Sequence, residues 1–175
     1  MPGRRLAMAI GKFITFEGGE GSGKSTQAQL LAARLRGRGS DTVLTREPGG
    51  SPFAEQVRAL ILDPATAPHS ALSEALLFYA ARSDHLDAAI RPALAAGRWV
   101  ICDRFSDSTR AYQGSLGNVS ASVLNAMQRV TIGDLKPDLT IILDIPVEVG
   151  QRRAAARRGS GAPDRFEAED LQFHR

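Results

Sequence analysis

The sequence has a single cysteine and no long hydrophobic run. Because Cys102 is the only cysteine among 175 residues, the chain cannot form an internal disulfide, as expected for a protein of the reducing cytosol. No segment approaches the ~20 consecutive apolar residues that a membrane-spanning helix requires. Near the N-terminus, Gly11 and Lys12 interrupt a short apolar stretch, so no signal peptide is predicted. We therefore expect a cytoplasmic protein with no membrane segment.

Lysine and aromatic residues are also scarce. Only three of the 22 basic side chains are lysine, aromatic residues make up 6% of the chain, and the net charge is +3. Arginine suits bidentate binding of phosphate, so both nucleic acids and small phosphorylated molecules are candidate partners. No nucleic-acid-binding motif is present and stacking side chains are few. We therefore expect small-molecule partners and no nucleic acid, with a nucleic-acid-binding module as the alternative.

Hydrophobic patterning predicts four strands that alternate with helices. The segments typical of strands are 12–17, 41–45, 98–102 and 138–143. Helical spacing covers 25–36, 52–62, 73–96, 120–132 and 146–158. This alternation predicts an α/β fold of three layers, with a parallel sheet between helices on both faces. No break in composition divides residues 12–175, so we expect one domain, preceded by an extension over residues 1–11.

A glycine-rich loop lies between the first predicted strand and the first predicted helix. Residues 18–25 match the G-x-x-x-x-G-K-[ST] pattern of phosphate-binding loops in full. In such loops, backbone N–H groups point at phosphate oxygens and the next helix N-terminus adds a favourable dipole. The predicted triphosphate-binding residues are Gly18, Gly19, Glu20, Gly21, Ser22, Gly23, Lys24, Ser25 and Thr26. The motif indicates nucleoside triphosphate binding and leaves the reaction open.

Ser25 and Asp103 are predicted to hold Mg²⁺ beside this loop. Phosphate-loop proteins hold the metal with the loop hydroxyl and an acid on a neighbouring strand, while the loop lysine, here Lys24, reaches the β- and γ-phosphates. Asp103 closes the third predicted strand, although it would also suit capping of the next helix. Arg104 follows at the carboxyl end of that strand, where open α/β sheets bind their ligands.

Other side chains predict a second phosphate-binding region. Arg46 follows the second strand, in a loop stiffened by Pro48. Phe78 and Arg82 are four residues apart on one predicted helix, so they present a ring and a guanidinium on the same face. Such a pair suits a nucleotide base, whereas core packing is the alternative for the phenylalanine.

A polar group follows Arg104 at a similar spacing. Ser108 and Tyr112 are four residues apart, with Thr109 and Gln113 alongside. These side chains offer donors and acceptors suited to a planar base, or form the polar side of a helix.

Arginines also gather around a flexible loop near the end of the sequence. The group comprises Arg152, Arg153, Arg157, Arg158, Asp164 and Arg165. A run of charges is often a solvated helix face. Beside a phosphate loop it predicts a mobile lid over about 152–166, which neutralises charge on the transferred phosphate and excludes water.

In combination, these motifs resemble those of the bacterial thymidylate kinases. The resemblance rests on residues 16–25, 45–50 (TREPGG), 77–82 (LFYAAR), 103–104, 108, 111–113 (AYQ) and 164–167 (DRFE). The REPGG segment is the most specific of these, because phosphate loops alone are widespread. The resemblance implies a P-loop NTPase fold and transfer of the γ-phosphate of ATP to dTMP, giving dTDP for dTTP synthesis. It also implies Mg²⁺ as cofactor and a homodimer.

The resemblance implies a role for each matching residue. Phe78 would stack on thymine, with Arg82 and the Ser108–Thr109 pair at its polar edge. Arg46 and Arg104 would hold the acceptor phosphate, and Tyr112 would disfavour a 2′-hydroxyl. The implied dTMP-binding set is Glu20, Arg46, Pro48, Phe78, Arg82, Arg104, Ser108, Thr109, Tyr112 and Gln113. The implied catalytic residues are Lys24, Arg104, Arg153 and Arg157, two of them from the lid because the phosphate loop has no arginine.

Two features depart from the family pattern. Phe105 stands where the family usually has Tyr or His. Family members also continue beyond residue 175, so we expect a last strand and part of the adenine site to be missing. A kinase for another nucleoside monophosphate and a nucleotide-hydrolysing switch remain alternatives. The asparagines, Asn118 and Asn125, do not fit the guanine motif of a GTPase switch.

Overall fold

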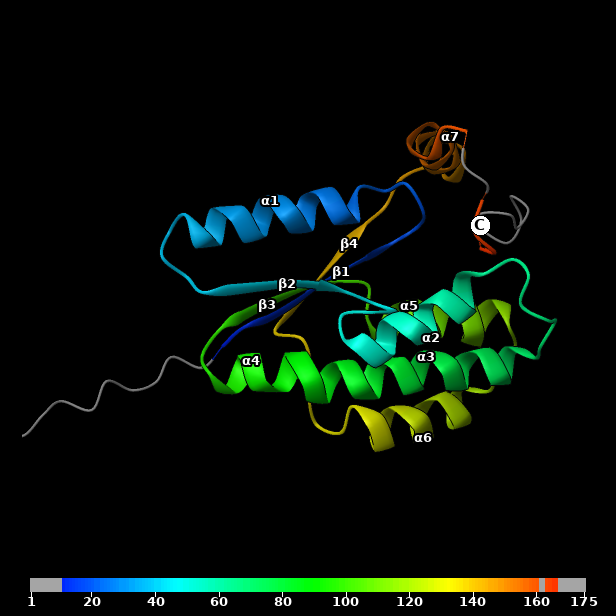
Figure 1. Cartoon of the computed structure of the whole chain (residues 1–175), viewed down its shortest axis with the longest axis horizontal. Coiled ribbons are helices and arrows are strands. Elements are labelled where there is room, and N and C mark those ends of the chain that lie inside the picture. Colours follow the sequence, from blue (N-terminus) through cyan, green and yellow to red (C-terminus); the bar gives the residue numbers. More distant parts are fainter. Residues whose placement is uncertain (1–10, 161–162, 167–175) are drawn as a thin grey trace, which may run out of the picture.

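The computed structural model describes residues 11–160 and 163–166 and contains a parallel four-stranded sheet (Figure 1). Its strands are β1 (Phe13–Gly18), β2 (Thr42–Arg46), β3 (Trp99–Asp103) and β4 (Leu139–Leu143). Their spatial order is β2-β3-β1-β4, and every pair is parallel. Each strand is found within one residue of the predicted bounds, and the α/β fold is confirmed.

Helices connect the strands. They are α1 (Lys24–Arg36), α2 (Pro52–Leu62), α3 (Ala71–His85), η1 (Leu86–Ile90), α4 (Arg91–Ala95), α5 (Ser106–Thr109), η2 (Arg110–Leu116), α6 (Ala121–Thr131) and α7 (Val147–Arg158). Serine hydroxyls cap three of the described helices, and at the start of α6 Ser120 accepts the backbone N–H of Val123. The Ser51 hydroxyl accepts the backbone N–H of Ala54 at the start of α2, and Ser70 does the same for Ser73 in α3.

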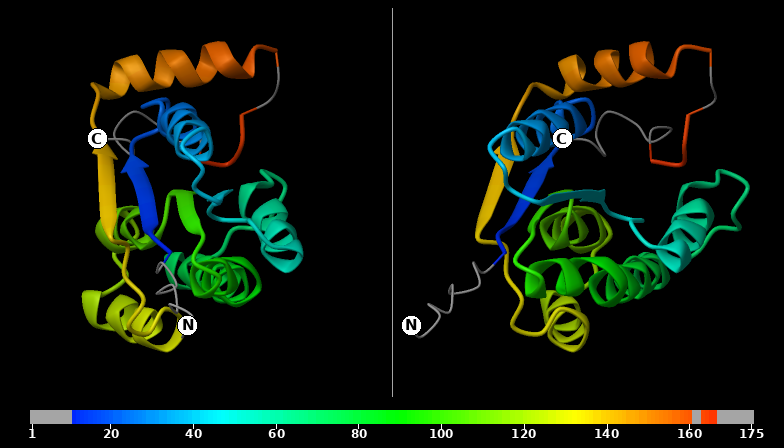
Figure 2. Two further views of the ribbon diagram at one scale, coloured as in Figure 1. Left: turned by 90° about the vertical axis from the view of Figure 1, so that its left-hand side faces the viewer. Right: turned by 60° about the vertical axis from the view of Figure 1, so that its left-hand side comes forward.

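The helices cover both faces of the sheet, as Figures 1 and 2 show. On one face α1 packs through Ala28 and Ala32 against Ile14 and Ile101. On the other face lie α3, η1, α4 and α6, and the core there includes the following buried residues: Phe13, Leu86, Ile90, Val100, Cys102 and Ile132. Neighbouring residues of β1 and β3 thus enter opposite cores, which explains the near-continuous apolar run of the central strands.

One predicted helix is interrupted. The sequence predicts a continuous helix over 73–96, whereas the structure has α3, a π-helical turn η1, and α4. Pro92 explains the interruption, because it has no N–H to donate and its ring excludes the carbonyl of Ala88. The extension expected over residues 1–11 lies outside the described residues except for Gly11. Among the described helices, none is both long and apolar enough to span a membrane.

The strand register brings the predicted site residues to one edge of the sheet. Phe16 of β1 pairs with Asp103, and so does Arg46 of β2. At the same edge Gly18 pairs with Leu143 of β4. Because all four strands are parallel, their carboxyl ends meet there, and ligands of open α/β sheets bind outside such an edge.

Candidate functional site

The phosphate loop curls at glycines between β1 and α1. Gly18, Gly21 and Gly23 have positive φ angles of 133°, 66° and 96°, a region that residues with a Cβ rarely enter. Lys24 is buried and its Nζ donates to the carbonyl of Gly19 at 2.6 Å. Burial lowers the pKa of this ammonium to about 8, with Arg104 adding to the effect. The loop therefore holds the Lys24 ammonium against its own backbone. A phosphate-binding site needs such a positive charge beside the bound phosphate.

A carboxylate oxygen at the end of β3 faces this loop. Oδ2 of Asp103 accepts a hydrogen bond of 2.5 Å from the hydroxyl of Ser25. Oδ1 of Asp103 is buried and has no hydrogen-bond partner among the described residues. Mg²⁺ prefers oxygen ligands such as a carboxylate and a hydroxyl. Oδ1 of Asp103, which has no partner among the described residues, is available to bind such an ion. These two residues therefore fit the predicted metal site.

Two cavities meet at this edge. The first, about 270 Å³, is lined by Glu20, Gly21, Gly23, Lys24, Ser25, Thr26, Arg46, Glu47, Arg58, Asp103, Arg104, Arg157 and Asp164. The second, about 120 Å³, is lined by Glu20, Glu47, Pro48, Arg58, Leu62, Phe78, Arg82, Arg104, Phe105, Ser108, Thr109, Tyr112, Gln113, Asp164 and Phe166. We call them the phosphate cavity and the acceptor cavity. Their shared residues, such as Glu20 and Arg104, place the two side by side.

A charged cluster forms the boundary between the cavities. Arg104 pairs with Glu20 at 3.1 Å, and Arg157 of α7 pairs with the other oxygen of the same carboxylate at 2.8 Å. Burial alone would raise the pKa of Glu20, but Arg104, Arg157 and Lys24 lower it to about 2. The carboxylate is therefore ionised and holds two arginines at the point where a phosphate would pass between the cavities.

The backbone of Arg104 is in the left-handed region. Its φ of 69° is unusual for a residue with a side chain. Its N–H donates to Phe16 at 2.8 Å, and the next N–H, of Phe105, donates to the buried carboxylate of Glu17 at 2.8 Å. The other oxygen of Glu17 accepts the hydroxyl of Ser108 at 2.6 Å. These bonds hold the strained turn that aims Arg104 at the cavities.

Arg82 forms one wall of the acceptor cavity. Its Nε donates to Glu47 at 2.6 Å, and its Nη2 donates to the carbonyl of Phe105 and the hydroxyl of Thr109. Nη1 is buried without a hydrogen-bond partner among the described residues. A fully buried donor in this state is costly unless a ligand accepts from it. The unpaired nitrogen therefore suits an oxygen on a bound molecule.

Aromatic rings form the rest of this cavity. Phe78 is half-buried and its ring lies 6.1 Å from that of Phe166, while Tyr112 lies 6.2 Å from the same ring. Phe78 also packs on the cluster of Ala54 and its neighbours. Phe78 therefore belongs both to this core cluster and to the wall of the acceptor cavity.

Gln113 and Arg46, two further predicted residues, are held by carboxylates. Gln113 is buried and donates to Glu74 at 2.7 Å. Arg46 is half-exposed at the phosphate cavity, and its guanidinium pairs with Glu55 at 3.0 Å. The acid thus holds the guanidinium at the rim, within reach of a phosphate.

Of the arginines described on the predicted lid helix, only one lines either of the two cavities. Gly150 of α7 packs on the phosphate loop so closely that a Cβ there would lie 2.3 Å from the carbonyl of Glu20. This contact brings Arg157 to the phosphate cavity, whereas Arg153, on the same helix, is exposed and lines neither cavity. Arg152 and Arg158 likewise line neither.

The described residues 163–166, which follow α7 in the sequence, lie at the acceptor cavity. Asp164 lines both cavities, and Phe166 lines the acceptor cavity. Arg165 forms an ion pair with Glu74, and its Nη1 is hydrogen-bonded to Nε2 of His69 at 2.9 Å. The predicted lid residue Arg165 therefore anchors this segment to α3 rather than facing the triphosphate.

Three residues of the site were absent from the predicted set. Arg58 lines both cavities and donates to the carbonyl of Pro48 at 2.8 Å. Glu47 and Glu17 are buried behind Arg82 and Arg104. A signal existed for Glu17, because an acid at the end of an apolar strand segment needs a buried partner. No such signal marked Arg58, because an arginine is an ordinary residue on a predicted helix.

A phosphate loop, an acid on the neighbouring strand and an adjoining cavity of rings and donors define a P-loop phosphotransferase that acts on a small phosphorylated acceptor. The family model described as thymidylate kinase matches residues 16–175. The chain belongs to the thymidylate kinase family, and the resemblance seen in the motifs is confirmed.

Similar proteins agree with this assignment. The chain is 68% identical over 165 residues to a thymidylate kinase of Bradyrhizobium sp. (strain BTAi1), covering 94% of this chain and 73% of that protein. It is 67% identical to a thymidylate kinase of Nitrobacter winogradskyi, covering 94% and 72%. The crystal structure of thymidylate kinase from Ehrlichia chaffeensis superposes with a TM-score of 0.74 at 39% identity, covering 85% of this chain and 88% of that one.

Proposed function

We propose that this chain transfers the γ-phosphate of ATP to dTMP, giving dTDP and ADP for dTTP synthesis. The observation that carries the proposal is the junction of the two cavities. One is lined by the phosphate loop. The other is lined by rings and by Arg82, whose Nη1 has no hydrogen-bond partner among the described residues, and Glu20 and Arg104 line both. A donor and an acceptor phosphate held on either side of this junction would face each other for in-line transfer.

The phosphate loop would bind ATP. Its backbone N–H groups and the N-terminus of α1 suit the phosphates, and Lys24 would neutralise the β- and γ-phosphates. Ser25 and Asp103 would hold Mg²⁺, which would supply positive charge to the transferred phosphate. Thr26, at the same cavity, would lie beside the phosphates.

The acceptor cavity would bind dTMP. Thymine would stack on Phe78, and Nη1 of Arg82 would donate to a base oxygen. Ser108, Thr109 and Gln113 would line the polar edge of the base, and Pro48 would cover it. Tyr112 would lie next to the sugar.

Arginines would hold and neutralise the reacting phosphates. Arg46 and Arg104 would bind the acceptor phosphate, and we add Arg58 because it lines both cavities. Arg157 would stabilise charge on the transferred group, and its pairing with Glu20 supports it over Arg153. Because the transfer needs no covalent intermediate, positioning and electrostatic stabilisation account for the catalysis.

We further propose a single kinase domain over residues 12–175, with a lid at about 152–166. A homodimer is the assembly we expect, and the exposed apolar side chains of α2 and α3, such as Phe53 and Leu76, would suit an interface. The single buried cysteine suits a reducing cytoplasm.

The test is transfer of label from [γ-³²P]ATP. The chain with Mg²⁺ and dTMP should produce labelled dTDP, and without dTMP the label should remain in ATP. Lys24→Ala or Arg104→Ala should lower turnover about 10²-fold or more, the scale expected for loss of one charge-stabilising donor. Labelled inorganic phosphate formed without dTMP would instead support a nucleotide-hydrolysing switch.

A further inference from the structure

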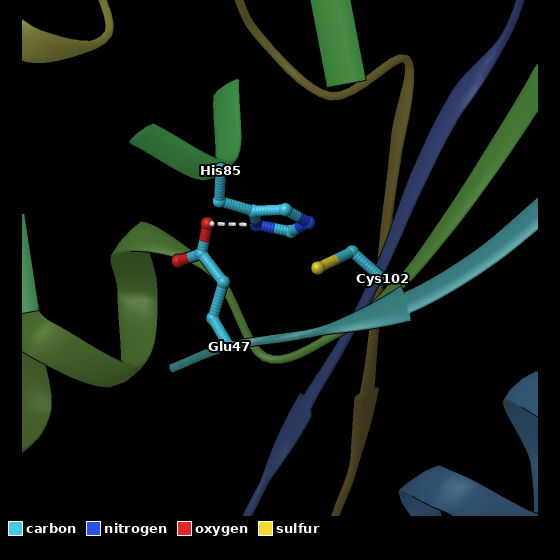
Figure 3. Close-up of side chains that lie close together, drawn as sticks. All are labelled: Glu47, His85 and Cys102. Carbon is cyan, nitrogen blue, oxygen red and sulfur yellow. Dashed lines mark hydrogen bonds and ion pairs between the residues drawn. The ribbon is translucent and has the colours of Figure 1, made fainter. Parts of the chain in front are cut away.

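A buried polar cluster that the proposed chemistry does not use adjoins the acceptor cavity, and of its three members Glu47 lines that cavity. Figure 3 shows Glu47 beyond the end of β2, His85 at the end of α3, and Cys102 on β3, with their side chains converging. All three are buried, and their nitrogen, oxygen and sulfur atoms lie within 4.8 Å of one another. A cluster of this kind binds a metal or serves as a hydrogen-bond network.

The bonds of the cluster favour a network. Burial raises the pKa of the Cys102 thiol well above its usual value, and Sγ donates to the carbonyl of Arg104 at 3.1 Å. Nδ1 of His85 lies 3.1 Å from one oxygen of Glu47, and the other oxygen accepts from Arg82. Protein groups therefore already use the atoms that a metal would need.

The histidine has a defined orientation. Because a carboxylate only accepts hydrogen bonds, Nδ1 carries the proton and donates to Glu47. Nε2 lies 2.7 Å from the hydroxyl of Thr45 on β2. A Cβ at Gly50 would lie 2.3 Å from Nε2, so the glycine leaves room for the ring. The imidazole is thus held at both nitrogens.

We propose that His85 is a positioning residue for Arg82, and so for recognition of the base. A carboxylate and a guanidinium prefer to pair through two parallel hydrogen bonds. Here only one oxygen of Glu47 accepts from Arg82, at 2.6 Å from Nε, because the other oxygen accepts from Nδ1 of His85. Nη2 of the arginine is left for Phe105 and Thr109. Nη1 has no hydrogen-bond partner among the described residues, in a side chain that lines the acceptor cavity.

Loss of the imidazole would release the second oxygen of Glu47. That oxygen would then compete for another nitrogen of Arg82 and turn the guanidinium plane, so that Nη1 no longer meets the base. The expected consequence concerns one position of the base. A donor at Nη1 favours the C4 oxygen of thymine over the C4 amino group of cytosine, so discrimination between dTMP and dCMP should depend on His85. This inference rests on the proposed function.

The test compares kcat/KM for dTMP and dCMP in the full chain with ATP and Mg²⁺. His85→Leu should lower the dTMP/dCMP ratio about tenfold, the scale of one hydrogen bond to a charged group, with the KM for ATP unchanged. His85→Asn keeps a donor near the place of Nδ1 and should restore most of the ratio. Asp87→Asn, on η1 with a side chain 72% exposed, is the control and should match the wild type.

Each other outcome overturns the inference. An unchanged ratio in His85→Leu, or an equal loss with dTMP, dCMP and ATP, would leave the histidine a merely structural role. If His85→Leu does not fold, Thr45→Val removes only the bond to Nε2 and should lower the ratio about threefold; an unchanged ratio there contradicts the inference. A wild-type chain that does not phosphorylate dTMP overturns the proposed function as well, whereas a dTMP-selective wild type with unchanged variants overturns the inference alone.

Discussion

Ser25, in the first turn of α1, donates a 2.5 Å hydrogen bond to Asp103 at the end of β3, although 78 residues separate them in the chain. The strand order brings them together, since β1 leads into the phosphate loop and pairs directly with β3. The second oxygen of Asp103 has no partner among the described residues. The pair therefore links the triphosphate site to the carboxyl edge of the sheet.

This pair predicts a specific dependence on Mg²⁺. Asp103→Asn removes the charge of the proposed metal ligand while keeping the shape of the side chain. We expect kcat to fall about 10²-fold and the Mg²⁺ concentration for half-maximal activity to rise, because the ligand charge is lost. A Mg²⁺ titration at saturating ATP and dTMP measures both. Asp134→Asn, at an exposed acid that lines neither cavity, is the control, and the same Mg²⁺ requirement in both variants would contradict the assignment.

Arg157 and Arg153 should differ in their contributions to catalysis. Both were predicted as catalytic, but only Arg157 lies at the phosphate cavity, on Glu20. Arg157→Ala should lower kcat between about tenfold and 10²-fold, whereas Arg153→Ala should change it less than about threefold. Steady-state kinetics at saturating substrates gives the comparison. A larger effect at Arg153 would mean that the lid reorganises when ATP binds.

The low pKa of Glu20 predicts how its contribution to stability changes with pH. Its pKa is lowered from 4.5 to about 2 in the folded chain by the neighbouring cations, against the effect of burial. The ionised carboxylate therefore stabilises the fold above pH 4.5, and this contribution is lost as the pH falls toward 2.

Glu20→Gln tests that expectation. The variant should be less stable than the wild type by on the order of 1–2 kcal/mol at pH 7, and the difference should shrink below pH 4.5. Urea unfolding at a series of pH values measures it, with Asp134→Asn as the matched loss of one surface charge. A difference that stays constant with pH would show that Glu20 acts by packing alone.

Tyr112 should determine the preference for deoxyribose. Its ring lies at the acceptor cavity, with the guanidinium of Arg104 5.5 Å from the ring centroid. Tyr112→Ala removes the bulk that would oppose a 2′-hydroxyl, so the dUMP/UMP ratio of kcat/KM should fall by about tenfold. Equal discrimination in the variant and the wild type would place the sugar elsewhere.

Local sequence patterns predicted most of the architecture. The four strands and the helix α2 are found at, or within one residue of, the predicted bounds. The spacing of hydrophobic residues and the positions of glycine and proline set these bounds, and both are local features of the sequence. The π-helical turn before Pro92 was missed, because helical spacing alone does not reveal a widened turn. The residues from Ser106 to Leu116 were read only as a helical spacing, since polar side chains dominate there.

The site was predicted less evenly. The phosphate loop and Arg104 carry their own motifs, and the structure brings them to one edge. Arg58 and His85 contribute through contacts with segments that are distant in sequence, such as Pro48 and Glu47. No local pattern encodes such contacts, because they depend on how α2 and α3 pack beyond the end of β2.

The most direct measurement offers the chain ATP, Mg²⁺ and an equimolar mixture of nucleoside monophosphates and follows the diphosphates by chromatography. The two joined cavities predict that dTDP is the dominant product, with weak formation of dUDP, and that ADP appears in equal amount to the transferred phosphate. Another diphosphate as the main product would keep the mechanism and contradict the acceptor. ADP formed without any acceptor product would contradict phosphate transfer itself.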